Sequence, residues 1–366
     1  MQWSLFPLIL MGHYSFFTCH LYEYHFIGEN KTWHEAQLYC REKYTDLATV
    51  YDMTDMKRLN DSVKTPPEAW IGLYNETGEE KRKWRWSLPG VDFSINKTNW
   101  ANDEPNDAGQ NGALENCVQV MGNQKWQDHE CSDEQEFICY NESSSDKFHW
   151  ISNVKKTWPQ AQSYCREHHT DLVSGDQLED ERIKNNPVTN WWIGLFRDTW
   201  RWSDGSNSSF RHWDQDLFKV GHEDKECAFL KTSGKWDSVN CTNKKPFLCY
   251  EDHLILIKQN KTWVEALYFC RKNHHDLVSI TNLHQQRWVQ QRAKKASSPY
   301  VWLGMRYTCT LGFWFWVSDE KGDYRNWDSD EETDNCDMSG AIQRGGQYKW
   351  FKKNDNDKFN FICSKF

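Results

Sequence analysis

The chain has 366 residues, of which 13 are cysteine, and its formal net charge is −9. This length indicates two or three domains rather than one core. A negatively charged chain repels phosphate backbones, so nucleic acid is not an expected partner. Because the cysteines form no CxxC pair, they favour disulfides in an oxidising compartment over zinc binding.

The N-terminus carries an apolar run from Leu5 to Met11, so residues 1–20 are predicted to be a secretory signal peptide that takes Cys19 with it. The alternative is a buried strand of the mature protein. No later segment has the ~20 apolar residues of a membrane span, and we predict a secreted, extracellular protein. Glycosylation sequons support that compartment, and the predicted sites are Asn30, Asn60, Asn75, Asn96, Asn141, Asn207 and Asn260.

A helix signal occurs three times, as "TWHEAQLYC" at Thr32, "TWPQAQSYC" at Thr157 and "TWVEALYFC" at Thr262. Trp, Ala and Cys follow each Thr at spacings that place them on one helical face. Thr is a favoured N-cap, and a Glu or Gln three residues later completes a capping box. The chain therefore contains three copies of one unit.

Short strand signals follow each helix. They include "WIGL" at Trp70, "WIGL" at Trp192 and "WLGM" at Trp302, and each copy closes on "FIC" or "FLC". Aromatic and β-branched residues between turn formers predict short strands. Each unit is thus predicted to contain a strand, two helices and several short strands, interrupted by a long irregular stretch. A long loop in a compact domain is usually functional.

The segment "NWANDEPNDAGQNGALENC", residues 99–117, is the long stretch of the first copy. Asp, Asn and Gly are turn formers, so one interpretation is a plain loop. Carboxylate and amide oxygens near a cysteine also suit a hard cation such as calcium.

The first two copies each contain four cysteines. Each set of four allows three connectivities, although nested pairing suits an order in which the terminal strands meet. In the first copy these are Cys40, Cys117, Cys131 and Cys139, and in the second Cys165, Cys227, Cys241 and Cys249.

Together these motifs resemble the C-type lectin-like domain family, and the three copies resemble a short, secreted member of its macrophage mannose receptor group. The resemblance implies an α+β fold of three tandem domains, each with two helices, short antiparallel sheets, a long loop and disulfides. The expected domains are residues 21–140, 141–250 and 251–366. The implied bridges are Cys40–Cys139, Cys117–Cys131, Cys165–Cys249 and Cys227–Cys241.

In the third copy, Cys270 and Cys363 are expected to form the long bridge, while Asp355 takes the place of the fourth cysteine. Cys336 then lacks its usual partner, and Cys309 is additional. We predict a Cys309–Cys336 bridge with an α-carbon separation of about 4.4–6.8 Å.

The resemblance also implies a calcium site in the first domain, whose ligands would be Glu104, Asn106, Glu115, Gln127 and Asp128, with Pro105 in cis. Glu104, Asn106, Glu115 and Asp128 would also bind the sugar. The order Glu-Pro-Asn resembles mannose-type selectivity, which covers mannose, fucose and N-acetylglucosamine. Gln127 departs from the family pattern, which has Asn there. The gap from Glu104 to Glu115 is wider than in mannose-binding members of the family.

The other copies lack this motif, and Lys352 in the third copy stands where Asp128 stands in the first. A lysine there repels a cation. Histidine pairs at 168–169 and 274–275 are interpreted as solvated helix ends rather than metal ligands. The chain has none of the catalytic motifs GxSxG, HExxH or a phosphate loop, so no enzymatic activity is expected.

The sequence thus predicts calcium-dependent binding of mannose-type glycans through the first domain, in innate immune recognition. The alternative is a set of lectin-like domains that bind a protein ligand without calcium.

Overall fold

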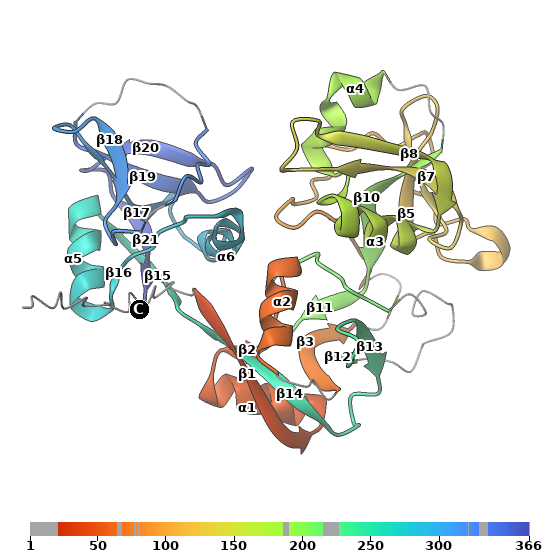
Figure 1. The fold of residues 1–366 in the computed structure, drawn as a ribbon, viewed down its shortest axis with the longest axis horizontal. Helices are drawn as coiled ribbons and strands as arrows, with labels where there is room; N and C mark the ends of the chain where they lie inside the picture. Colours follow the sequence, from red (N-terminus) through yellow and green to blue (C-terminus); the bar gives the residue numbers. More distant parts are fainter. Residues whose placement is uncertain are drawn as a thin grey trace, which may run out of the picture.

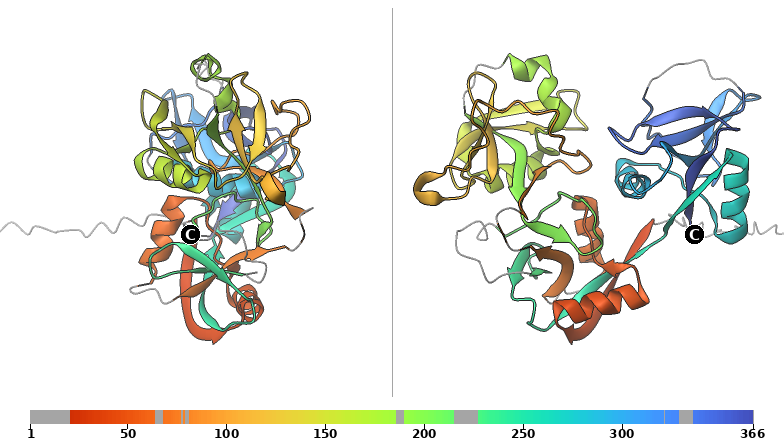
Figure 2. Two further views of the ribbon diagram at one scale, coloured as in Figure 1. Left: turned by 90° about the vertical axis from the view of Figure 1, so that its right-hand side faces the viewer. Right: turned by 180° about the vertical axis from the view of Figure 1, so that it is seen from behind.

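The computed structural model describes residues 21–63, 68–76, 78, 81–185, 190–214, 227–320, 322–328 and 336–365. The predicted signal peptide lies outside the described residues. These residues form three compact units, each built on one sheet (Figures 1 and 2). The mixture of helices and sheets in every unit confirms the predicted α+β class.

The first unit combines elements from two repeats. From the first repeat it takes β1 (Tyr22–Lys31), α1 (Trp33–Lys43), β2 (Asp46–Leu47), α2 (Met53–Asp61) and β3 (Ala69–Asn75). From the second it takes β11 (Trp200–Trp202), β12 (Cys227–Leu230), β13 (Trp236–Val239) and β14 (Lys245–Asp252). Figure 1 shows these late strands beside the early ones at the bottom of the molecule.

The second unit contains the remaining halves of the same two repeats. The first repeat supplies β4 (Lys83–Trp86), the 3₁₀ helix η2 (Gln110–Gly112), β5 (Cys117–Val120), β6 (Trp126–His129) and β7 (Gln135–Tyr140). The second supplies β8 (Phe148–Lys156), α3 (Trp158–His168), β9 (Asp171–Leu172), the 3₁₀ helix η3 (Gly175–Glu179), α4 (Glu181–Lys184) and β10 (Trp191–Asp198).

The third unit is built from the third repeat alone. Its elements are β15 (Leu254–Lys261), α5 (Trp263–Asn273), β16 (Asp276–Leu277), α6 (Leu283–Ala293), β17 (Tyr300–Thr308), β18 (Phe313–Trp316), β19 (Met338–Gln343), β20 (Trp350–Asn354) and β21 (Phe359–Ser364).

The three sheets share one topology. Their strand orders are β1-β14-β3-β12-β13, β8-β7-β10-β5-β6 and β15-β21-β17-β19-β20, with two short strands attached to each. Pairing is antiparallel except at one central parallel pair per sheet, such as β17 with β21. The first two sheets therefore reproduce the third, but each draws its strands from both repeats.

A short connection explains this exchange. In the third unit β17 turns back to pair with β18, and residues 309–312 form the turn. In the second repeat only Thr199 separates β10 from β11. A hairpin in the same register would leave Asp198 and Thr199 as the turn, and two-residue hairpin turns favour Gly or Asn-Gly. The chain instead runs on from β10 into the first unit, where β11 pairs with β3.

The exchange overturns two implied disulfides. The pairings Cys40–Cys139 and Cys165–Cys249 are wrong, because the structure has Cys40–Cys249 and Cys139–Cys165, with α-carbons 5.3 and 5.2 Å apart. The last strand of each repeat lies in the sheet that holds the other repeat's first helix, so its cysteine meets that helix. The inner bridges Cys117–Cys131 and Cys227–Cys241 are as implied.

The third unit has the Cys270–Cys363 bridge and also the predicted Cys309–Cys336 bridge, whose α-carbon separation of 5.5 Å lies in the expected range. Asp355 does take the place of the missing cysteine. Its carbonyl accepts from Trp263 N, as the Cys241 carbonyl accepts from Trp33 N in the first unit.

The compact units do not follow the expected domain boundaries within residues 21–250. Those boundaries divide the sequence into repeats, whereas the first two units each take one half from each repeat. The expected boundaries stay a prediction of where one sequence repeat ends and the next begins.

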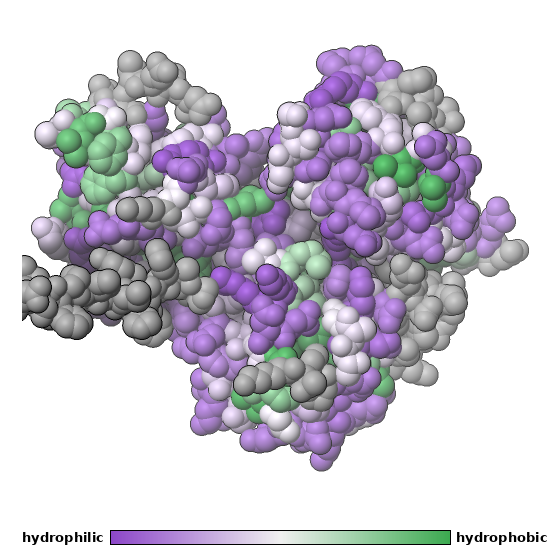
Figure 3. Space-filling view, in the orientation of Figure 1, coloured by the Kyte–Doolittle hydropathy of each residue, from purple (hydrophilic) through white to green (hydrophobic). Residues whose placement is uncertain are grey.

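The repeated motifs supply the cores. The capping boxes at Thr32, Thr157 and Thr262 are present, as predicted. Most residues on the face shown in Figure 3 are hydrophilic, and many tryptophans are fully buried, among them Trp70, Trp192 and Trp302. The glycine of "WIGL" is required by close packing: a Cβ on Gly72 would meet the Leu47 carbonyl oxygen at 2.9 Å.

Candidate functional site

The long loop of the first repeat lies in the second unit. It runs from Trp100, which forms an isolated β-bridge with Trp126, to strand β5. The Glu104–Pro105 peptide bond is cis, as predicted. The loop continues through η2 and returns to Cys117, so that its carboxylates face β6, which carries Gln127 and Asp128.

Glu104, Asn106 and Asp128 are brought together. The Asn106 side-chain amide donates to Glu104 Oε1 at 3.0 Å, and the Asn106 backbone N–H donates to Asp128 Oδ1 at 3.0 Å. The other oxygen of Glu104, Oε2, is buried without a hydrogen-bond partner. Asp128 is itself fully buried.

Glu115 joins the same group from the end of the loop. Its Oε2 accepts from the Ala108 backbone N–H at 2.9 Å, and that N–H also donates to Asn106 Oδ1 at 2.7 Å. Its Oε1 lies 3.7 Å from His129 Nδ1. Glu115 is thus linked to Asn106 through one shared donor.

Burial and neighbouring carboxylates govern the acidity of Glu104 and Glu115. Burial raises the pKa of Glu104 to about 7, and the adjacent Asp128 carboxylate adds to the rise. Burial and Asp128 also raise the pKa of Glu115. A buried, unpartnered oxygen on Glu104 beside a second carboxylate suits a hard cation, so these residues fit calcium.

Gln127 does not join them. Its side-chain oxygen accepts from Gln119 Nε2 at 3.1 Å, across the β5–β6 pair. The carboxylates of Glu104, Glu115 and Asp128 also do not all lie within 4.8 Å of one another. Among the described residues, the only group of three or more His, Cys, Asp or Glu with ligand atoms all within 4.8 Å is Asp52, Asp55 and His284.

Two arginines that sequence reasoning missed enter the loop. Arg197 Nη2 donates to Asp107 Oδ1 at 2.7 Å and to Asp128 Oδ2 at 2.8 Å. Arg82 pairs with Asp107 Oδ2 at 2.5 Å and also donates to Asn116. Burial acts to raise the pKa of Asp107, but Arg82, the Glu115 N–H and Arg197 outweigh it and hold the pKa below its ordinary value. Arg197 belongs to the second repeat, so no pattern within the first repeat could reveal it.

The long loops of the other two repeats lie partly outside the described residues. Residues 215–226, the second repeat's loop, lie outside the described residues. In the third repeat Lys352 lies over the Trp327 ring, 6.0 Å from its centre. His169 and His274 lie at the ends of α3 and α5, as predicted, and cap them through their backbone N–H groups. His169 is half-buried and stacks on His149, so it is not a solvated residue.

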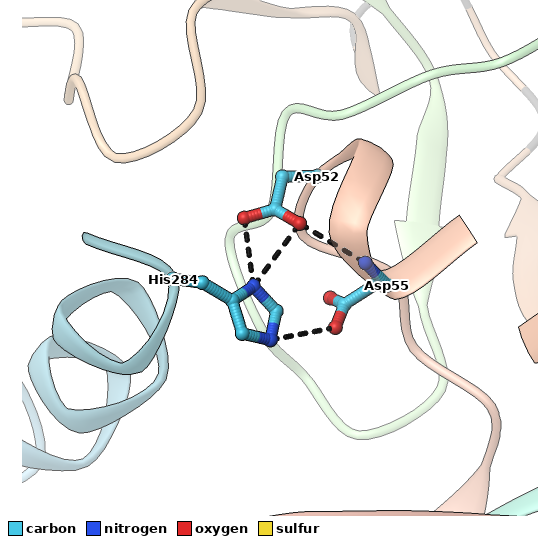
Figure 4. A group of neighbouring side chains, drawn as sticks. All are labelled: Asp52, Asp55 and His284. Carbon is cyan, nitrogen blue, oxygen red and sulfur yellow. Dashed lines mark hydrogen bonds and ion pairs between the residues drawn. The ribbon is translucent and has the colours of Figure 1, made fainter. Parts of the chain in front are cut away.

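Asp52, Asp55 and His284 form a second cluster, between α2 and α6 (Figure 4). Both ring nitrogens of His284 face carboxylates: Nδ1 lies 2.9 Å from Asp52 Oδ2, and Nε2 lies 3.4 Å from Asp55 Oδ1. Donors occupy all four carboxylate oxygens, among them Arg287, the Tyr22 hydroxyl and the Tyr51 N–H. This saturation, with an arginine included, is typical of a structural contact rather than a metal site.

The predicted glycosylation sites differ in exposure. Asn30, Asn96, Asn207 and Asn260 are exposed, whereas Asn60, Asn75 and Asn141 are partly buried. Asn75 also accepts a hydrogen bond from Thr199. Modification at all seven stays a prediction.

The family model "Lectin C-type domain" matches residues 29–141, 154–251 and 259–365. Human C-type mannose receptor 2 is 24% identical over 365 residues, covering 82% of this chain and 24% of the receptor. Human secretory phospholipase A2 receptor is 19% identical over 372 residues, covering 81% of this chain and 24% of that protein. The chain thus spans about a quarter of the length of these relatives.

Among solved structures, CEL-IV is 22% identical with a TM-score of 0.28, over 30% of this chain and 83% of its own. No helix among the described residues is long and apolar enough to cross a membrane.

Proposed function

Because the chain belongs to the C-type lectin domain family, whose members bind carbohydrates or proteins, we propose that it binds mannose-type glycans through calcium held in the loop of the first repeat. The proposed calcium ligands are Glu104, Asn106, Glu115 and Asp128, with Gln127 as a fifth that must turn from Gln119. The same proposal includes the secretion of the protein and a role for this glycan binding in innate immune recognition.

The observation that carries this proposal is the oxygen cluster around Glu104. A buried oxygen without a partner, beside the carboxylate of Asp128, is costly unless a cation or a proton joins them. Calcium takes about six to eight oxygen ligands. When bound, it would supply open coordination positions for two neighbouring sugar hydroxyls.

The chain's own residues would orient the sugar. Glu104 accepts and Asn106 donates, and the two are already joined by a 3.0 Å hydrogen bond. A hydroxyl that bridges them can donate to the acid and accept from the amide. This arrangement favours sugars that present a matching pair of neighbouring hydroxyls.

A calcium-independent protein ligand is the second candidate. Arg82 and Arg197 already neutralise part of the acidic loop, and Gln127 faces Gln119. A loop stabilised in this way can present a protein-binding surface without a metal.

Retention on mannan-agarose separates the two candidates. The proposal predicts retention in calcium and release by a chelator. Glu104→Gln removes one charge without changing shape and should abolish retention, because the cation loses a ligand charge. Asp103→Asn is the matched control: it removes a charge from the adjacent exposed residue, whose φ of 62° Asn tolerates. If the wild type is not retained, the protein-binding candidate is favoured.

A further inference from the structure

We infer that the positive charge of Arg197 stabilises the loop in the absence of calcium and weakens calcium binding. The second repeat contributes this residue to the site of the first. The inference deepens the proposed function and rests on it. It concerns a residue that controls the affinity of the site and does not contact the sugar in our proposal.

The contacts of Arg197 place its charge at the base of the site. One nitrogen, Nη2, reaches Asp128 Oδ2 at 2.8 Å, Asp107 Oδ1 at 2.7 Å and the Glu115 carbonyl at 2.7 Å. Nε donates to the same carbonyl at 3.0 Å. The guanidinium also lies over the Trp84 ring, 4.6 Å from its centre. These contacts link the middle of the loop, at Asp107, and its end, at Glu115, to Asp128 on β6.

Arg197 reaches this site because the first two repeats exchange halves. Arg197 lies near the end of β10, which pairs with β4 and β5 of the first repeat. The side chain is 12% exposed, and the Asp128 side chain that it contacts is 0% exposed. The site of the first repeat is therefore completed by the second.

Two consequences follow from the charge of Arg197. A guanidinium on Oδ2 orders Asp128 before any metal arrives, so the loop keeps its shape in a chelator. The same charge would repel a divalent cation held by the carboxylates of this site, because Asp128 is fully buried and its surroundings are poorly solvated. Calcium affinity should accordingly be lower than the four ligands alone would give.

Substitutions of Arg197 separate these effects. Arg197→Gln keeps an N–H donor but removes the charge, whereas Arg197→Lys keeps the charge. We expect calcium affinity, measured by isothermal titration calorimetry of the whole chain, to rise about tenfold in Arg197→Gln and not to rise in Arg197→Lys. The melting temperature in a chelator should fall in Arg197→Gln and should recover when calcium is added.

Arg201→Gln is the control. Arg201 also has a 12% exposed side chain and pairs with a carboxylate, Glu76, but it lies in β11 of the first unit. Its substitution should leave calcium affinity unchanged.

The outcomes distinguish this inference from the proposed function. If the wild type binds calcium and Arg197→Gln binds it equally well, the inference is overturned while the proposed function stands. If only Arg197→Gln binds calcium, the inference is supported and the proposed function of the natural chain fails. If no variant binds calcium, both are overturned.

Discussion

At the scale of single residues, Gln127 is the predicted ligand that faces away from the site. Its carbonyl oxygen accepts from Gln119 at 3.1 Å. Asn is one methylene shorter, so Gln127→Asn should bring the amide oxygen back towards Asp128 and lose less side-chain entropy on ordering. We predict severalfold tighter calcium binding, measured by calorimetry. Gln110→Asn, in the exposed part of the same loop, is the control, and equal affinity of wild type and Gln127→Asn would refute the prediction.

The Glu104–Asn106 pair sets the predicted sugar preference. Glu104→Gln combined with Asn106→Asp exchanges the donor and the acceptor while keeping the hydrogen bond between the two side chains, because the new Gln can donate to the new Asp. The pair of sugar hydroxyls that fits best then changes as well. We predict that binding moves from mannose towards galactose on a glycan array in calcium. Unchanged preference for mannose would place the sugar elsewhere.

Sequence reasoning identified part of this site. The cis proline and the gathering of Glu104, Asn106 and Asp128 were implied by the family resemblance, because Glu-Pro-Asn is a continuous motif and Asp128 stands two positions after the Trp of "KW". Arg197 was not predictable, because it belongs to the second repeat and lies 69, 82 and 90 positions from its contacts Asp128, Glu115 and Asp107. Contacts of that kind depend on which strands pair, and local patterns carry no such information.

At the scale of elements, the helices and strands were largely predictable and their partners were not. Capping boxes and alternating aromatic residues are local signals, and the structure confirms the helices that follow Thr32, Thr157 and Thr262. The first two repeats share the motifs "WIGL" and "WRWS", so each strand fits the sheet of either copy. The short β10–β11 connection is the one sequence feature that could have indicated the exchange.

This connection can be changed by one substitution. Thr199→Gly creates an Asp-Gly pair, which two-residue hairpin turns favour, so β10 and β11 could then pair with each other. We predict that refolded Thr199→Gly contains a fraction of the repeat-wise bridges Cys40–Cys139 and Cys165–Cys249, detected by peptide mapping without reduction. The wild type should give Cys40–Cys249 and Cys139–Cys165.

Thr199→Ala is the matched control for that substitution. It also removes the hydroxyl that donates to Asn75, but it does not favour the turn, so its bridges should match the wild type. Repeat-wise bridges in the wild type itself would contradict the exchanged fold.

At the scale of the whole molecule, α6 joins the third unit to the first. The Trp288 ring stacks on Tyr22 with centres 3.9 Å apart, and Arg292 forms an ion pair with Asp252. One apolar core extends across both units. His284 lies at the centre of this contact, between Asp52 and Asp55 (Figure 4).

Removing His284 should loosen this contact. His284→Ala leaves Asp52 and Asp55 buried with fewer partners, and breaking one side of a buried charged pair costs about 3–5 kcal/mol. We predict a lower melting temperature and faster proteolysis between the first and third units. His275→Ala, which changes an exposed histidine at the end of α5, should have neither effect. Unchanged proteolysis of His284→Ala would show that the apolar core alone holds the units together.

The same cluster should make stability depend on pH. Burial raises the pKa of Asp55 to about 6, and the neighbouring charge of Asp52 adds to the rise. An unfolded aspartate has a pKa near ~3.9, so the folded state holds the Asp55 proton more tightly. The stability that this provides is complete below about pH 4 and is lost as the pH rises through about 6.

Asp52 acts in the opposite direction. Burial alone would raise the pKa of Asp52, but His284 and Arg287 outweigh it and hold the pKa well below its ordinary value. Its contribution is therefore present above about pH 4 and is lost only in stronger acid. Between pH 5 and pH 7, Asp52 stays ionised in both states, so it does not offset the change at Asp55.

Comparing the wild type with Asp55→Asn isolates the Asp55 contribution, since the variant keeps Asp52, His284, Arg287 and Tyr22 but lacks the titrating group. We predict that the melting temperature of the wild type minus that of Asp55→Asn is larger at pH 5 than at pH 7, because the wild type loses the bound proton over this interval. Asp61→Asn, at the exposed end of α2, should show the same difference at both pH values. A difference for Asp55→Asn that stays constant, or grows towards pH 7, would mean that Asp55 is already ionised at pH 5 and that its burial does not govern its protonation.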